Sequence, residues 1–163
     1  MEMNERVRSV CFTGHRQIDK DLDARGLYNA MEALIEDGYN IFICGGALGF
    51  DTVAAKMVLE FKKINPEIKL HLYLPCSNQD ARWSYADRIQ YRKILASADY
   101  VDMPEQIYYD GCMRVRNYKM VDSSSVCICY LNNSVKSGTA QTVRYAERCG
   151  LKVINVSVSQ SKQ

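Results

Sequence analysis

The segment at residues 41–51 constrains the fold of this chain most, because an apolar run leads directly into a glycine-rich turn and then into a helical pattern. In a parallel α/β sheet, such a unit brings backbone N–H groups and the positive end of a helix dipole to one place. Gly45, Gly46 and Gly49 can adopt positive φ angles and allow a ligand to approach the backbone closely. The segment therefore predicts an anion pocket, with a tight turn that binds nothing as the alternative.

The rest of the chain repeats this alternation of short apolar runs, rich in β-branched residues, with longer segments of helical period. The pattern predicts six strands, at residues 7–13, 40–44, 68–74, 100–102, 125–131 and 152–156. It predicts five helices between them, at residues 22–37, 51–64, 80–96, 111–122 and 138–149. Right-handed crossovers then give an α/β fold, a three-layer Rossmann-like sandwich with a mostly parallel sheet. Ligands of such sheets bind beyond the carboxyl ends of the strands.

Length and charge limit the remaining interpretations. The chain has 163 residues, which suits a single domain over residues 1–156, and residues 157–163 are expected to form a flexible tail. Its 21 basic and 19 acidic side chains give a net charge of +2. That balance does not favour bulk electrostatic attraction to nucleic acid or to an anionic membrane.

Neither a membrane segment nor a metal site is expected. The chain lacks a run of about 20 apolar residues, and its N-terminus lacks the apolar stretch of a signal peptide, so we expect a cytoplasmic protein without a membrane partner. Its seven cysteines contain no C-x-x-C pair and mostly lie in apolar runs. They are interpreted as reduced core residues.

Two further clusters are expected at the same edge of the sheet as the glycine turn. Gly14, His15 and Arg16 follow the first strand, where the two basic side chains could contact a phosphate, or could simply belong to a solvated turn. Residues 137–139 (Ser137, Gly138 and Thr139) open the last long helix, where a hydroxyl and free N–H groups form an anion cradle or a plain helix cap.

Three other side chains are candidate ligand contacts. Asp51 could accept a hydrogen bond from a ribose or from a loop amide, although an acid in the first turn of a helix is also favourable by itself. Arg116 and Asn117 could reach the crevice over a base or phosphate, or belong to a solvated basic face.

Taken together, these motifs closely resemble the YpsA-like family of the SLOG superfamily, over nearly the whole chain. The superfamily consists of Rossmann-like domains, including the cytokinin-activating phosphoribohydrolases and a domain of DNA-processing protein A. The resemblance implies binding of a nucleotide or a nucleotide-derived ligand, such as AMP, NAD or an ADP-ribose-like molecule, in a sensor or adaptor. It rests on residues 12–16, 45–51 with 54–55, 74–75, 83, 116–117 with 120–122, and 137–139 with 145–146.

The resemblance does not carry over an enzymatic activity. The phosphoribohydrolase branch has acidic residues after its Gly-Thr pair, whereas here Thr139 is followed by residues 140–142, Ala-Gln-Thr. Cleaving an N-glycosidic bond needs a carboxylate, so no catalytic residue is assigned, and nucleoside 5′-monophosphate hydrolysis remains an alternative. Arg116 matches the branch's arginine only loosely and is expected to contact ligand.

A third interpretation is single-strand DNA binding, because the glycine pattern at residues 45–54 also resembles DNA-processing protein A. The balanced net charge argues against a basic groove of that kind. The expected partner is therefore a small-molecule nucleotide, with nucleic acid second. No cofactor is assigned, and self-association is left open.

Overall fold

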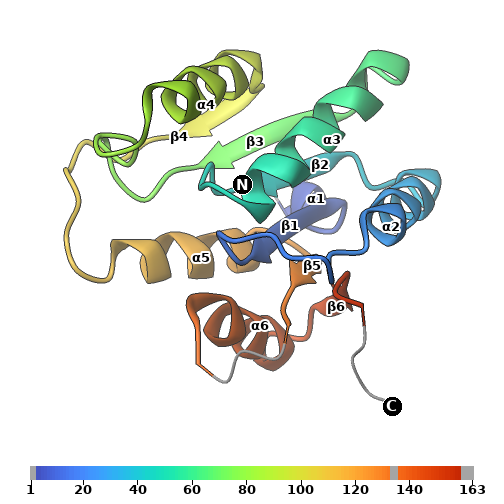
Figure 1. The fold of residues 1–163 in the computed structure, drawn as a ribbon. Helices are drawn as coiled ribbons and strands as arrows, with labels where there is room; N and C mark the ends of the chain where they lie inside the picture. The colour runs from blue at the N-terminus through green and yellow to red at the C-terminus, as the bar shows by residue number, and fades with distance from the viewer. Residues whose placement is uncertain (1–2, 133–135, 159–163) are drawn as a thin grey trace.

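The computed structural model describes residues 3–132 and 136–158, and contains one sheet with helices on both faces (Figure 1). In chain order the elements are α1 (Met3–Arg6), β1 (Ser9–Gly14), α2 (Ala24–Glu36), β2 (Ile41–Cys44), α3 (Phe50–Ile64), β3 (Lys69–Tyr73), α4 (Tyr85–Ser97), β4 (Tyr100–Asp102), α5 (Cys112–Asp122), β5 (Val126–Tyr130), α6 (Gly138–Arg148) and β6 (Lys152–Asn155).

The six strands are all parallel and lie in the order β4-β3-β2-β1-β5-β6. The chain thus builds the sheet outward from β1 to β4 and then crosses over to add β5 on the opposite side of β1. Pairing between β1 and β5 runs in register from Val10–Val126 to Gly14–Tyr130. This topology confirms the Rossmann-like α/β prediction and puts the reversal of strand order between β1 and β5.

Two apolar layers hold the helices to the sheet. Val10 and Phe12 of β1 point into the layer that contains α2, α3 and α4, whereas Cys11 between them points into the layer of α5 and α6. The alternation is the period-two geometry of a strand that is buried on both faces. Figure 1 shows α3 and α4 on one side of the sheet and α5 and α6 on the other.

The predicted elements are all present, and most boundaries move by only one or two residues. Gly38 and Gly150 end α2 and α6 with φ angles of 101° and 81°, as left-handed residues after a helix do. Helix α4 begins later than predicted, at Tyr85, where Ser84 caps it by accepting a hydrogen bond from the Asp87 N–H at 3.1 Å. The short helix α1 was not predicted.

The seven cysteines are free thiols, and six of them are buried, with Cys149 exposed. The first two residues of the predicted tail are held in place. Ser157 bridges to Leu22, and the Val158 N–H donates to the Asp21 carbonyl at 2.7 Å. Residues 159–163 lie outside the described part of the chain. Within the described ranges, no helix has the length and apolar character that crossing a bilayer requires.

Candidate functional site

A cleft of about 300 Å³ opens at the carboxyl ends of the strands, at the point where strand order reverses. This is the place where open parallel sheets bind their ligands. The cleft is lined by the end of β1, the turn after β2, one face of α5 and the start of α6. Its residues are Phe12, Thr13, Gly14, His15, Arg16, Ala47, Asp51, Met113, Arg116, Asn117, Met120, Ser137, Gly138 and Thr139.

The loop after β1 is anchored to the start of α3. The Phe50 N–H donates to the His15 carbonyl at 3.0 Å. Gly49 has a φ of 82°, and a Cβ added there would lie 2.1 Å from the Arg16 carbonyl oxygen. Only glycine fits this close backbone contact. The His15 ring packs edge-on against Tyr130, and its Nε2 accepts a hydrogen bond from the Asn132 N–H at 3.3 Å. The loop therefore presents His15 and Arg16 to the cleft from a fixed backbone.

The glycine-rich turn is held largely by the protein's own groups. The Gly45 carbonyl accepts from Arg116 Nη1 at 2.5 Å, and the Ala47 N–H donates to Asp51 Oδ2 at 3.2 Å. Thr52 Oγ1 donates to the Ala47 carbonyl at 3.0 Å. Gly45, Gly46 and Gly49 themselves do not line the cleft. In this structure these bonds hold Asp51 and Arg116 against the turn.

The space beside Gly45 explains why a glycine stands there. A Cβ at this position would lie 2.5 Å from Arg116 Nη1 and 2.8 Å from Asp51 Oδ2. Gly46 faces a different environment, toward Leu74 and Tyr91. The two charged side chains thus pack directly over the backbone of Gly45.

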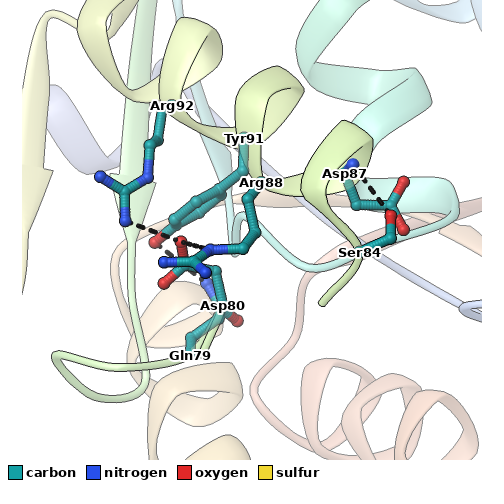
Figure 2. Close-up of polar contacts among 7 residues, drawn as sticks. All are labelled: Gln79, Asp80, Ser84, Asp87, Arg88, Tyr91 and Arg92. Atoms are coloured by element: carbon teal, nitrogen blue, oxygen red, sulfur yellow. Dashed lines mark hydrogen bonds and ion pairs between the residues drawn. The ribbon is translucent and has the colours of Figure 1, made fainter. Parts of the chain in front are cut away.

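The loop between β3 and α4 contacts the same turn through Gln79, and Figure 2 shows how Gln79 and Asp80 of this loop lie beside α4. Gln79 Nε2 donates to the Gly46 carbonyl and to the Tyr91 hydroxyl, both at 3.4 Å. Asp80 anchors the loop to α4 through ion pairs with Arg88 at 3.6 Å and Arg92 at 3.3 Å. Gln79 was not predicted to take part in the site, because nothing in the local pattern indicates that it reaches a turn more than 30 residues away.

Asp51 and Arg116 are buried charges at the floor of the cleft, with 6% and 5% of their surfaces exposed. Burial raises the pKa of Asp51, and the Arg116 charge and the N–H groups of Ala47 and Gly45 oppose this. Burial likewise lowers the pKa of Arg116, and Asp51 opposes it. Besides the Gly45 carbonyl, Arg116 bonds the Tyr73 carbonyl at 3.2 Å. Arg116 therefore does not belong to a solvated basic face.

The start of α6 completes the cleft. Ser137 Oγ accepts from the Ala140 N–H at 3.0 Å, which is the bond of a helix cap. Thr139 is buried, and Ser137, Gly138 and Thr139 all border the cleft. The segment thus caps the helix and also faces the cavity.

Nine of the twelve predicted ligand-binding residues line this one cleft, and the three glycines of the turn lie behind it. Met113 and Met120 also line the cleft and were not predicted as ligand contacts. Both methionines could have been predicted from the sequence, because residues 113, 116, 117 and 120 have the spacing of a single helix face. Within the described residues, no group of three or more histidine, cysteine or acidic side chains is placed to hold a metal ion.

The fold and the cleft together define a doubly wound, Rossmann-like domain with a cleft at its topological switch point. The family model YpsA, described as the YspA SLOG family, matches residues 11–159. The chain therefore belongs to the YpsA SLOG family.

Two similar proteins are named as uncharacterised or by a protein-family number. The chain is 36% identical over 94 residues to UPF0398 protein BH1768 of Halalkalibacterium halodurans, covering 56% of this chain but only 50% of that protein. It is 30% identical over 129 residues to the uncharacterized SPbeta prophage-derived protein YoqJ of Bacillus subtilis, covering 72% of this chain and 75% of YoqJ.

Two solved structures share the fold. DNA processing protein A from Helicobacter pylori, described for its single-stranded DNA binding mode, superposes with a TM-score of 0.69 at 17% identity, over 99% of this chain and 72% of that one. DNA processing protein A from Streptococcus pneumoniae gives a TM-score of 0.67 at 18% identity, over 96% and 52%. At these identities the likeness concerns the fold alone.

Proposed function

We propose that the cleft binds a nucleotide or nucleotide-derived ligand and that the protein acts as a sensor or adaptor. The observation that carries the proposal is the convergence of Arg16, His15 and the start of α6 on one cavity at the switch point. A guanidinium and the N–H groups of a first helical turn are the protein groups that bind phosphate best. Since Gly45, Gly46 and Gly49 do not line the cleft, the phosphate is assigned to Arg16 and α6.

The size of the cavity favours a small ligand. A volume of about 300 Å³ lies at the lower end of the range for small-molecule sites. Met113 and Met120 add an apolar wall that suits a base. A mononucleotide such as AMP is therefore a better candidate than NAD.

Calorimetric titration with AMP and with adenosine tests the proposal. AMP is expected to bind more tightly than adenosine, and Arg16→Ala should weaken AMP binding about 10-fold or more because it removes a charge-assisted contact. Arg25→Ala is the matched control, since Arg25 is exposed and lies outside the cleft. Equal affinity for AMP and adenosine, or equal effects of the two substitutions, would contradict the proposal.

Hydrolysis of a nucleoside 5′-monophosphate is the second candidate, and the position of Asp51 favours it. This buried carboxylate borders the cleft, although it does not come from the motif of the phosphoribohydrolase branch. Incubation with AMP followed by chromatography separates the two functions. Release of free adenine that is lost in Asp51→Asn would establish the enzyme, and intact AMP would favour the sensor.

Single-strand DNA binding remains a candidate because DNA processing protein A shares the fold. A gel-shift titration at physiological salt decides it. Micromolar, salt-sensitive binding of an oligonucleotide would favour this function over the small-molecule one.

A further inference from the structure

The cleft contains one group that a phosphate would avoid. Among the cleft-lining residues that the structure describes, Asp51 alone is acidic, whereas His15, Arg16 and Arg116 are basic. An ionised carboxylate only accepts hydrogen bonds, and it repels an anion. Asp51 therefore has to face a part of the ligand that is neutral and carries hydrogen-bond donors.

The contacts of Asp51 leave it able to accept more bonds. The carboxylate accepts from the Ala47 N–H, at 3.2 Å to Oδ2, and from the Gly45 N–H, whereas a carboxylate has about four acceptor positions. The neighbouring Arg116 guanidinium is directed at other acceptors, the carbonyls of Gly45 and Tyr73 and the side chain of Asn117. A buried carboxylate with unused acceptor capacity at the edge of a cavity is suited to neutral donors of a ligand.

The position of Arg16 indicates which donors these are. Arg16 borders the same cleft and is close enough to Asp51 for its charge to lower the carboxylate's pKa. In a nucleotide the sugar is directly attached to the phosphate. If Arg16 holds the phosphate, the sugar is the group that lies within reach of Asp51, and the hydroxyls of a ribose are its hydrogen-bond donors.

We propose that Asp51 accepts hydrogen bonds from the ribose hydroxyls of the ligand and thereby selects ribonucleotides over deoxyribonucleotides. This inference rests on the proposed nucleotide binding and adds a substrate class to it. Loss of a hydroxyl would leave the buried acceptor without its partner, so a deoxy analogue should bind clearly more weakly.

The test compares AMP with 2′-deoxy-AMP and 3′-deoxy-AMP by calorimetry. For the wild-type protein, at least one deoxy analogue is expected to bind about 10-fold or more weakly than AMP. In Asp51→Asn a neutral amide replaces the charged acceptor and makes a weaker hydrogen bond to a hydroxyl, so the preference should be clearly reduced. Asp110→Asn is the control, because it removes the same charge from an exposed loop position outside the cleft. This variant should keep the preference.

The possible failures are distinguishable. If wild-type protein binds all three nucleotides equally, the ribose inference is overturned and the proposed function stands. If it binds none of them, both are overturned. Equal loss of the preference in Asp51→Asn and Asp110→Asn would also overturn the inference. If Asp51→Asn fails to fold, the wild-type ranking of the three nucleotides decides.

Discussion

At the scale of single residues, the most unusual feature is the pair of buried charges beside Gly45. Burying a charge is unfavourable unless hydrogen bonds compensate for it. Arg116 donates hydrogen bonds to two backbone carbonyls and to the Asn117 side chain. Asp51 accepts hydrogen bonds from backbone N–H groups and borders the open cleft. Asp51 is thus the less compensated of the two, which is typical of a residue kept for binding and not for stability.

Asp51→Asn is predicted to leave the free energy of unfolding at pH 7 unchanged or to raise it. The reason is that burial raises the pKa of Asp51 above its ordinary 3.8, so ionisation at neutral pH destabilises the folded state. This penalty is fully present above the folded-state pKa and disappears as pH falls toward 3.8. Urea unfolding of both proteins at several pH values measures it. A variant less stable than wild type by over about 2 kcal/mol at pH 7 would contradict this account.

Gly45→Ala is predicted to destabilise the fold by about 1–3 kcal/mol, because the added Cβ would overlap Arg116 and Asp51. Gly138→Ala is the matched control, since a Cβ there meets nothing within 4 Å. Denaturant unfolding should show a clear loss for the first variant and little change for the second. Similar losses in the two would mean that the space beside Gly45 is not what requires glycine.

The roles of these residues could be predicted from the sequence only in part. The glycine turn was correctly placed between a strand and a helix, but its role in packing Arg116 could not be predicted. Arg116 lies 71 residues from Gly45, and only the folded sheet brings them together. Locally, Arg116 has the features of a solvated residue on a charged helix, and tertiary contacts override that pattern.

At the scale of elements, the start of α6 has two roles, because Ser137 caps the helix and borders the cleft. Helix α4 offers a comparison, since Ser84 makes the same capping bond outside the cleft. Comparing the two serines separates the structural role from ligand binding.

Ser137→Ala and Ser84→Ala are each predicted to lower the free energy of unfolding by about 1 kcal/mol through loss of a helix cap. Only Ser137→Ala is expected to weaken AMP binding as well. Thermal unfolding and calorimetry on the two variants measure both effects. Parallel changes in AMP affinity would argue against a ligand at α6.

The elements were predicted well where their patterns are long and periodic. The late start of α4 was missed because residues 80–84 form a turn, in which the Trp83 N–H donates to the Asp80 carbonyl at 3.1 Å, and Ser84 then caps the helix. The helix α1 was missed because four residues are too few to show a period.

At the scale of the whole molecule, topology explains why the cleft was predictable. All six strands are parallel, so their carboxyl ends share one edge, and the crossover from β4 to β5 opens a crevice beside β1. Polar residues that follow β1 and β5 therefore had to meet there. The volume of the cavity and its apolar wall from α5 depend on side-chain packing and were not predictable.

The central claim is that this cleft, and no other surface, receives a nucleotide phosphate. Titration of isotope-labelled protein with AMP, followed by backbone amide chemical shifts, tests it most directly. The account predicts saturable shifts at Gly14, His15, Arg16 and residues 137–139, with none in the outer groove between α3 and α4 that Leu59 and Ile89 line. Shifts confined to that groove, or none up to millimolar AMP, would contradict it.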